Sequence, residues 1–360
     1  MDVPTRKGIR TGRGAVSNPA GRFEPTRAEL LDDGWGILDE ELPPLATTVQ
    51  AEPAKSIISR NQSPDIPFDQ SINPYRGCEH GCIYCYARPS HAYLNLSPGL
   101  DFETKLFYKP DAAKLLEKEL AAPGYKCSPI TIGANTDPYQ PIEREYRVTR
   151  SIIEVLAKYR HPLSIITKSA MIERDIDLLA DMARSNLVLA LVSVTTLDNE
   201  LKRTLEPRTA SPAARLRAIR RLSDAGIPVG VMVAPVIPVL TDSEVEKILE
   251  ACAAAGARSA GYVLLRLPHE VSPLFRDWLE QNEPLKAKHV LTRMREMRGG
   301  RDYDATFGRR QTGVGEYASL LEKRFDRACV KYGLKMRERF VHDRTLFQPP
   351  RTGPQQLNLL

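Results

Sequence analysis

The chain has 360 residues, of which 42% are hydrophobic and 27% are charged, and its formal net charge is +6. This composition is ordinary for a globular protein, and six cysteines are too few for a disulfide-dense scaffold. No run approaches the roughly 20 apolar residues of a membrane helix, and the first thirty residues lack the apolar region of a secretory signal. We therefore expect a cytoplasmic protein.

The first 60 residues are predicted to be a mobile or loosely docked extension, because they are rich in Gly, Pro and charged residues and show no sustained apolar period. The sequence pattern changes near Ser71, where short apolar runs begin to alternate with segments of helical period. This alternation is typical of βα units around a parallel sheet. It predicts a core domain over residues 61–270.

Six strands and five helices are expected in this core. The helix at 212–225 has the clearest limits, because Ser211 can cap it, Pro212 suits the first helical position and Gly226 suits the left-handed position after its end. The strands are expected at residues 71–76, 129–134, 163–167, 187–195, 228–235 and 259–265, and the helices at 111–121, 148–159, 173–184, 212–225 and 242–255.

The predicted fold class is α/β. Right-handed crossovers would roll the six strands into a partial (β/α)6 TIM-like barrel, whose active-site residues lie at the carboxyl ends of the strands. A flat doubly wound sheet is the alternative.

After about residue 268 the alternation ceases, and residues 271–347 are predicted to form a basic helical extension packed on the barrel, with helices at 285–297 and 317–332. Residues 286–360 hold 17 Lys and Arg against 8 Asp and Glu. Such an asymmetry attracts polyanions such as nucleic acid, although a solvated helix surface carries similar charge. Residues 348–360 are rich in Pro, Gly and Gln and are predicted to be disordered.

The glycine-rich loop at 298–315 allows two interpretations. Its arginines and aromatic residues could cradle phosphates and stack on a base. The loop could equally seal the open side of the barrel, as lids near a barrel mouth do. The residues concerned are Arg298, Arg301, Arg309, Arg310, Tyr303 and Phe307.

Three of the six cysteines crowd into eight positions directly after the first predicted strand, at Cys78, Cys82 and Cys85. Thiolates are the ligands of iron-sulfur clusters, and three closely spaced ones can hold three corners of a cubane, which leaves the fourth iron free for another ligand. A zinc site is the alternative, with His80 or His91 as the fourth ligand. The spacing and the barrel pattern that follows favour the cluster.

The C-x3-C-x2-C spacing, with Tyr84 before the third cysteine, resembles the signature of the radical S-adenosylmethionine (radical SAM) superfamily. This resemblance implies a [4Fe-4S] cluster whose open iron chelates S-adenosylmethionine. It also implies reductive cleavage of that cofactor to a 5′-deoxyadenosyl radical that abstracts hydrogen from a substrate. An electron donor such as flavodoxin or ferredoxin would be a partner.

Within the superfamily, residues from about 70 to 265 resemble the spore photoproduct lyase branch, also called photolyase-like. The resemblance rests on the cysteine triplet, the Thr-Asp after the second strand, the Thr-Lys after the third strand and the Glu-Pro-Arg-Thr segment at 206–209. It implies contacts with the methionyl part of S-adenosylmethionine from Thr136, Lys168 and Ser193, and places Tyr84 and Tyr86 beside the adenosyl part.

One departure from the branch bears on the reaction. In true spore photoproduct lyases a cysteine near the end of the second strand donates a hydrogen atom to the product radical, and Ala134 stands there in this sequence. Cys127 lies seven residues earlier. Thymine-dimer reversal is therefore not expected. The sequence is closer to photolyase-like radical SAM proteins of unassigned reaction, which share the stretches at 135–143 and 307–315.

The last five residues, Gln356–Leu360, resemble the short peptide by which bacterial proteins bind the sliding clamp. Together with the branch resemblance and the basic C-terminal region, this peptide favours DNA or another nucleic acid as substrate. A peptide, tRNA or small-metabolite substrate is the alternative within enzymes. A non-catalytic iron-sulfur or zinc module that binds nucleic acid is the alternative outside them.

Overall fold

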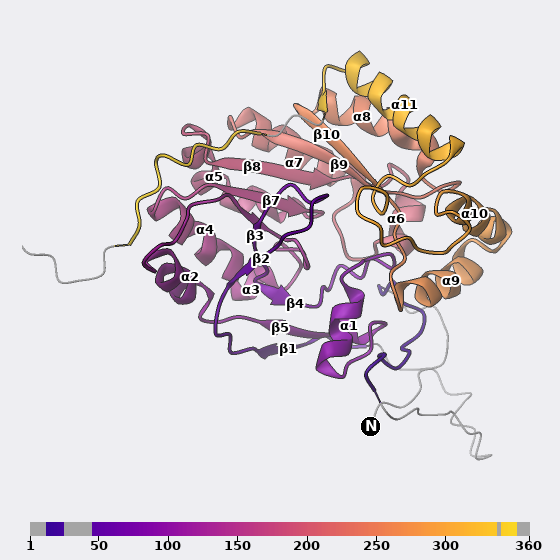
Figure 1. Cartoon of the computed structure of the whole chain (residues 1–360), viewed down its shortest axis with the longest axis horizontal. Coiled ribbons are helices and arrows are strands. Elements are labelled where there is room, and N and C mark those ends of the chain that lie inside the picture. Colours follow the sequence, from indigo (N-terminus) through magenta and orange to yellow (C-terminus); the bar gives the residue numbers. More distant parts are fainter. Residues whose placement is uncertain (1–11, 25–44, 337–339, 351–360) are drawn as a thin grey trace, which may run out of the picture.

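The computed structural model describes residues 12–24, 45–336 and 340–350. Its centre is an eight-stranded sheet (Figure 1) in the order β11-β10-β9-β8-β7-β6-β3-β2. The strands from β3 to β11 run parallel to their neighbours, whereas β2 is antiparallel to β3. Their bounds are β2 Ile58–Arg60, β3 Gln70–Ile72, β6 Ile130–Ile132, β7 Leu163–Thr167, β8 Val188–Ser193, β9 Val229–Val236, β10 Ser259–Leu264 and β11 Lys335–Met336.

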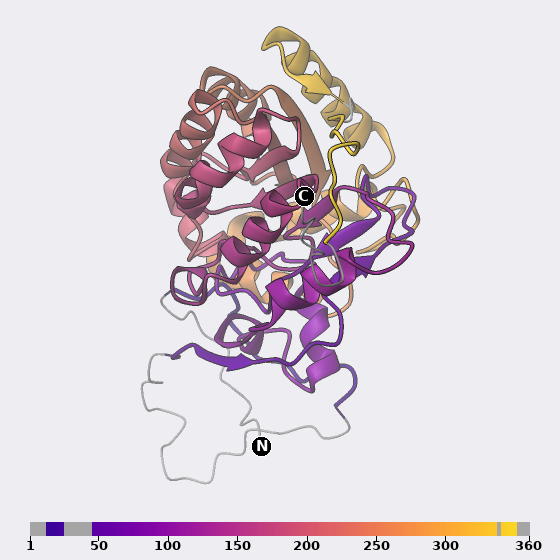
Figure 2. The ribbon, with the colours of Figure 1, turned by 90° about the vertical axis from the view of Figure 1, so that its left-hand side faces the viewer.

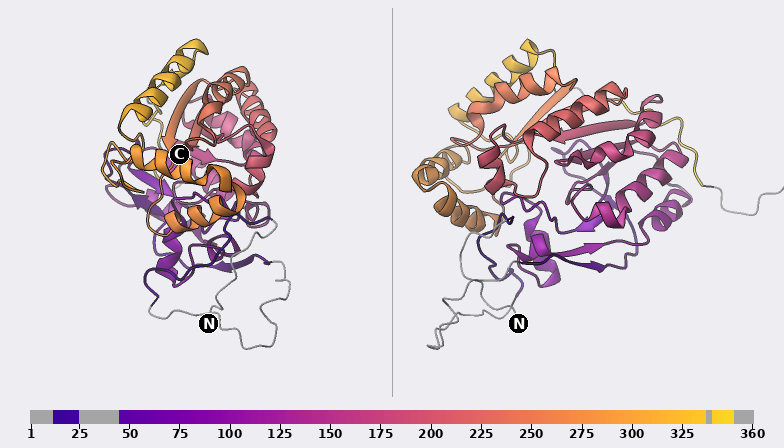
Figure 3. Two further views of the ribbon diagram at one scale, coloured as in Figure 1. Left: turned by 90° about the vertical axis from the view of Figure 1, so that its right-hand side faces the viewer. Right: turned by 180° about the vertical axis from the view of Figure 1, so that it is seen from behind.

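A continuous row of helices covers one face of this sheet (Figure 3). Neighbouring elements of the row are in contact, from α2 through α4 to α5, from α5 through the 3₁₀ turn η2 to α7, and from α7 through α8 to α11. A single covered face fits the partial barrel and not the doubly wound sheet. The helices are α2 Ala112–Leu120, α4 Val148–Lys158, α5 Ile176–Ala183, α7 Pro212–Asp224, α8 Val245–Ala254 and α11 Glu316–Lys331, and the 3₁₀ turns η2 Ala170–Asp175 and η3 Asp242–Glu244 precede α5 and α8.

The α/β prediction is confirmed, and five of the six predicted strands match β6 to β10 closely. The predicted limits of α7 are also confirmed, because the Ser211 side chain accepts a hydrogen bond from the Ala214 amide at 3.2 Å and Gly226 has a φ of +79°. Most buried aliphatic side chains of β6 to β9 share one face of the sheet, whereas the other face carries mainly polar, small or partly buried residues. That pattern is expected for strands that pack one face against a layer of helices.

The prediction of one continuous strand at 71–76 is wrong. It splits into β3 and a two-residue strand, β4 Tyr75–Arg76, which belongs to a separate three-stranded sheet. Pro74 lies at the break, and a proline offers no amide hydrogen to a strand ladder. The small sheet has the order β1-β5-β4, with β1 Thr48–Ala51 and β5 Lys105–Tyr108.

The described part of the N-terminal segment packs against the core (Figure 2). Residues 13–17 are buried, and β1 pairs with β5. At the other end, residues 340–350 return toward β7, where the His342 ring contacts the Leu163 carbonyl at 3.0 Å. The disorder predicted for 348–360 and the peptide at 356–360 fall mainly outside the described residues, although the Gln348 amide donates to the Tyr159 carbonyl at 2.9 Å.

The C-terminal extension contains α9 Val271–Asn282, α10 Pro284–Glu296 and α11, and α9 is a helix that the sequence analysis did not predict. The remaining short elements are η1 Arg88–Leu94, α1 Asp101–Thr104, α3 Glu143–Tyr146 and α6 Asn199–Leu205. None of the helices in the described ranges has the length and apolar character needed to cross a membrane.

The loop between α10 and α11 joins the two sides of the open barrel. The Gln311 carbonyl accepts the Leu264 amide of β10 at 2.8 Å, while the Gln311 side chain donates to the Asp65 carbonyl at 3.0 Å. Asp65 lies in the turn between β2 and β3, and its carboxylate pairs with Arg310 at 2.5 and 2.7 Å. The loop therefore seals the gap between the first and last strands of the barrel, as one of the two interpretations proposed.

Candidate active site

A pocket of about 300 Å³ opens at the carboxyl ends of the parallel strands. Every residue that the sequence analysis proposed as a cluster ligand or as a contact with S-adenosylmethionine lines this one pocket, although the residues come from four separate segments of the chain. They are Cys78, Cys82, Tyr84, Cys85, Tyr86, Thr136, Lys168 and Ser193. The described structure thus gathers the predicted ligands and the predicted strand-end residues around a common space.

The cysteines lie on a tightly folded loop. The Cys78 amide donates to the Phe102 carbonyl at 2.9 Å, and the Cys85 amide donates to the Cys82 carbonyl at 3.2 Å. Gly77 begins the loop with a φ of +74°, and a Cβ on it would lie 2.9 Å from the Phe102 oxygen. The loop needs a glycine there for both conformation and space.

A buried ion pair clamps this loop from behind. The Arg88 guanidinium donates to the carbonyls of Gly81 at 3.1 Å and Cys82 at 3.0 Å, and to the Glu103 carboxylate at 2.5 Å. Both charged side chains are fully buried. Glu103 also accepts the amides of Gly14 at 3.0 Å and Ala15 at 2.8 Å, so the clamp ties the N-terminal segment to the cysteine loop.

The three thiols fit an iron-sulfur cluster. None of them forms a disulfide, and burial raises the pKa of Cys78, Cys82 and Cys85 above the ordinary value of a thiol. Thiols of this kind, two buried and one partly buried, become thiolates when a cationic partner compensates their charge, which the irons of a cluster do. The donor set and its enclosure therefore match a cubane held at three corners.

The two histidines offered for a zinc site have other partners. His80 Nδ1 lies 3.3 Å from the Asp137 carboxylate, and His91 Nε2 contacts the Lys105 carbonyl at 3.0 Å. In the ranges that the structure describes, no three His, Cys, Asp or Glu side chains gather around one point, as a single metal ion would require. In a cubane cluster each cysteine binds a different iron, so the three thiolates need not converge on a single point.

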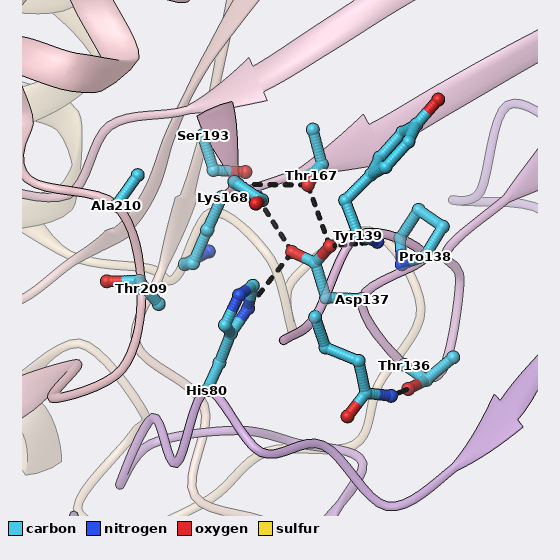
Figure 4. Close-up of polar contacts among 12 residues, drawn as sticks. His80, Thr136, Asp137, Pro138, Tyr139, Thr167, Lys168, Ser193, Thr209 and Ala210 are labelled. Carbon is cyan, nitrogen blue, oxygen red and sulfur yellow. Dashed lines mark hydrogen bonds and ion pairs between the residues drawn. The ribbon is translucent and has the colours of Figure 1, made fainter. Parts of the chain in front are cut away.

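Asp137 organises the polar side of the pocket (Figure 4). Its carboxylate accepts the Thr167 hydroxyl at 2.7 Å and the Lys168 amide at 2.8 Å, and it faces His80. Burial alone would raise the pKa of Asp137, but His80 and these donors outweigh it and hold the pKa at about 2. Asp137 is therefore ionised and fixes the turn that presents Lys168.

Thr136 and its neighbour Gln140 connect strand β6 to the cysteine loop. The Thr136 hydroxyl donates to the Gly77 carbonyl at 2.7 Å. The Gln140 amide nitrogen lies 3.1 Å from the Thr136 hydroxyl, and its oxygen accepts the Glu79 amide at 2.8 Å. Thr136 therefore supports the loop in addition to lining the pocket.

Tyr84 is anchored beneath the pocket. Its hydroxyl donates to the buried Glu206 carboxylate, which also pairs with the buried Arg215 guanidinium. Burial opposes ionisation of Glu206, but Arg215 and Lys168 outweigh it and hold the pKa at about 2. Arg215 in turn donates to the Ser193 carbonyl at 3.0 Å, so this network links the cysteine loop to the end of β8.

Lys168, Tyr86 and Arg266 occupy the more open part of the pocket. The Lys168 ammonium donates to the Ala234 carbonyl at 3.2 Å and lies 5.8 Å from the Tyr84 ring centroid. The Tyr86 hydroxyl donates to the Ala134 carbonyl, and the Arg266 guanidinium lies 4.7 Å from the Tyr86 ring centroid. Tyr86 therefore spans the pocket from the end of β6 to the end of β10.

The supporting residues were missed from the sequence alone. Asp137 and Glu206 stood in motifs that the sequence analysis quoted, but no role was predicted for either residue. The signal for Asp137 was the density of polar residues directly after a predicted strand, whereas Glu206 lies beyond α6 and had no such signal. Arg266 directly follows the strand predicted at 259–265 but was not selected, whereas the Arg88–Glu103 pair carried no such signal.

Comparisons with known proteins point to one family. A family model described as the radical SAM superfamily matches residues 72–252. An uncharacterized protein of Mycobacterium tuberculosis is 40% identical over 234 residues, which cover 64% of this chain and 68% of that protein. An uncharacterized protein of Methanocaldococcus jannaschii is 31% identical over 213 residues, which cover 59% of this chain and 76% of that protein.

Solved structures of spore photoproduct lyase resemble the fold. One mutant of that enzyme, with dinucleoside spore photoproduct, gives a TM-score of 0.55 at 17% identity and covers 80% of each chain. Another structure, complexed with the same compound, gives a TM-score of 0.53 at 16% identity and covers 80% of this chain and 81% of that one. At these identities the likeness concerns the fold alone.

Proposed function

The chain belongs to the radical SAM superfamily, whose cofactors are a [4Fe-4S] cluster and S-adenosylmethionine, and from this premise we propose that Cys78, Cys82 and Cys85 hold the cluster in an enzyme that abstracts hydrogen from its substrate. The observation that carries the proposal is the convergence of three free thiols, two buried and one partly buried, and three polar strand ends on one pocket. When bound, the cluster supplies one electron for the cleavage of S-adenosylmethionine to a 5′-deoxyadenosyl radical.

The chain's own residues bind and orient the cofactor. Lys168 and Ser193 suit the methionyl carboxylate, because an ammonium and a hydroxyl are donors to an oxyanion. Thr136 lies beside the cysteine loop and suits the methionyl amine. Tyr84 and Tyr86 offer ring faces to the adenosyl part, with Tyr84 fixed by Glu206 and Tyr86 fixed by the Ala134 carbonyl.

The experiment is anaerobic reconstitution with iron and sulfide, followed by dithionite, S-adenosylmethionine and chromatography for 5′-deoxyadenosine. We expect 5′-deoxyadenosine from the wild type and none from Cys82→Ala. Cys127→Ala is the matched control, because Cys127 precedes β6 and lies outside the pocket. A loaded cluster that yields no 5′-deoxyadenosine, with or without oligonucleotides, would favour the non-catalytic binding module.

The proposed substrate is DNA or another nucleic acid. The basic loop at 298–315 reaches the pocket through Gln311, and its Phe307 side chain is exposed beside Arg310. Oligonucleotide binding that weakens steeply with salt supports this substrate class. Salt-independent binding, or none, would favour a peptide or a small metabolite, and binding limited to folded tRNA would identify a tRNA substrate.

The reaction is proposed to differ from thymine-dimer reversal. Ala134 lines the pocket, and the described cysteines that line it are the three proposed ligands. The other proposed partners are an electron donor such as flavodoxin or ferredoxin, and a sliding clamp bound through Gln356–Leu360. Six free thiols suit a reducing compartment, so the proposed location is the cytoplasm.

A further inference from the structure

The open side of the pocket carries a cation that the proposed cofactor contacts leave unused. Arg266 lies just beyond the carboxyl end of β10 and lines the pocket. Its guanidinium lies over the Tyr86 ring. Among the residues that the structure describes, no carboxylate pairs with it. A pocket cation without a counterion is a binding group for an anion.

The backbone beside Arg266 and the Tyr86 ring are both fixed by hydrogen bonds before any ligand arrives. The Leu265 carbonyl, next to Arg266, accepts the buried Arg298 guanidinium at 2.8 Å, and the Leu265 amide donates to the Val236 carbonyl at 3.0 Å. The Tyr86 hydroxyl is bound to the Ala134 carbonyl. Preorganised donors lose little conformational freedom when they bind a ligand.

The local charge balance also favours an anion. Asp137, the carboxylate that lines the pocket, is already compensated by His80 and by donors from Thr167 and Lys168. Arg298 is 2% exposed, and its Nε atom is buried without a hydrogen-bond partner among the described residues. First burial and then the positive charge of Arg266 lower the pKa of Arg298 to about 10. The buried Arg298 guanidinium therefore adds to the positive charge around Arg266.

The neighbouring wall of the pocket is apolar and aromatic. It contains Phe68 from the β2–β3 turn and the side chains around the end of β10, which are Val263, Leu264 and Leu265. Such a wall suits a flat ring, and base stacking on aromatic side chains is a common mode of nucleotide binding. A nucleotide combines a flat base with a phosphate, which matches this wall and its single cation.

We propose that Arg266, stacked on Tyr86, forms a phosphate subsite for a nucleotide substrate at the open side of the pocket. This inference rests on the proposed function, because the substrate must enter the pocket that holds S-adenosylmethionine. Lys168 serves the carboxylate of the cofactor, and Arg266 serves the phosphate of the substrate.

The test compares two single-stranded pentanucleotides of the same mixed sequence, one with phosphodiester linkages and one with uncharged methylphosphonate linkages. Each is titrated into the reconstituted full-length enzyme with S-adenosylmethionine. We expect the wild type to bind the charged form about tenfold more tightly. Arg266→Gln should abolish this difference, and Arg266→Lys should retain part of it because the charge remains without the planar fork.

Arg217→Gln is the matched control, because it removes the same charge from the exposed face of α7 and should keep the full difference. Release of 5′-deoxyadenosine without oligonucleotide is measured in parallel in the wild type and in Arg217→Gln and should be the same in both. A wild type that releases 5′-deoxyadenosine but binds both pentanucleotides equally, or neither, would overturn the phosphate subsite alone. A wild type that releases none would overturn the proposed function instead.

Discussion

Asp137 joins three parts of the pocket through one partly buried carboxylate, and its low pKa makes that contribution depend on pH. The pKa of about 2 lies below the ordinary value of 3.8, so the stabilisation is fully present above about pH 4 and is lost as the pH falls through 2. We expect Asp137→Asn to lower the free energy of unfolding by about 2 kcal/mol at pH 7 and by about half of that at pH 3.

Urea unfolding at several pH values measures this difference. Asp181→Asn is the control, because Asp181 is exposed on α5 beside Arg184 and should change stability by less than about 0.5 kcal/mol. A loss of stability in Asp137→Asn that stays the same down to pH 3 would show that the charge of Asp137 is not what stabilises the pocket.

Glu206 and Tyr84 share a hydrogen bond but should respond differently to substitution. Glu206→Gln leaves the buried Arg215 guanidinium without its counterion, and breaking a buried pair in this way costs about 3–5 kcal/mol. Tyr84→Phe removes one donor to a charged acceptor, which costs about 1–3 kcal/mol, and leaves the ring in the pocket. Thermal unfolding should therefore rank Glu206→Gln below Tyr84→Phe.

Tyr84→Phe also tests which part of the Tyr84 side chain contacts S-adenosylmethionine. Since the ring face is the proposed contact with the adenosyl part, Tyr84→Phe should bind S-adenosylmethionine within about twofold of the wild type. A large loss of affinity at unchanged stability would instead assign the contact to the hydroxyl.

At the scale of elements, the N-terminal segment acts as a brace for the cysteine loop. A Cβ on Gly14 would lie 1.9 Å from the Gly81 carbonyl oxygen, so Gly14→Ala must displace one of the two backbones. We expect Gly14→Ala to lower cluster content after reconstitution by at least about half, because the displaced segment removes two amide donors from the Glu103 clamp. Iron and sulfide analysis measures this content.

Gly12→Ala is the control in the same segment. Gly12 has a φ of +75° and open space around it, so alanine there brings backbone strain but no clash. If Gly12→Ala and Gly14→Ala lose the same amount of cluster, general loosening of the segment and not its contact with Gly81 explains the loss.

The elements that the sequence predicted well are those whose pattern is local. Strands β7 to β10 are short apolar runs between helical segments, and helix α7 has its cap and its terminal glycine beside it. The contact of the N-terminal segment with Glu103 has no such local pattern. Glu103 meets Gly14 across 89 positions of sequence, and residues 12–24 have no apolar period that would indicate burial. Only the folded chain brings them together.

At the scale of the molecule, the sequence predicted which strand ends meet, but not how the barrel is closed. The C-x3-C-x2-C motif meets the residues at the carboxyl ends of β6, β7 and β8, because parallel strands place these ends at one edge of the sheet. The closure depends instead on Gln311 and Asp65, which are 246 positions apart. Their contact follows from the number of strands and the position of the loop. The residue types at these two positions do not by themselves predict the contact.

This closure leads to a prediction about opening of the pocket. The Asp65–Arg310 pair is partly buried, with side-chain exposures of 10% and 15%, and it holds the β2–β3 turn against the loop at 298–315. Removing a partly buried, bidentate pair should destabilise the closed form by about 1–2 kcal/mol, which is roughly tenfold in the opening equilibrium. In Asp65→Ala, amide hydrogen exchange should therefore accelerate about tenfold in residues 62–68 and 303–313 and remain unchanged in β7 and β8.

Asp302→Ala is the control, because Asp302 pairs with Arg276 and Arg295 on the same extension at 37% exposure without contacting the turn. Equal exchange in the two variants would mean that the loop is held by the hydrogen bonds of Gln311 and not by the ion pair. Selective acceleration in Asp65→Ala would make this pair the element that controls access to the strand ends.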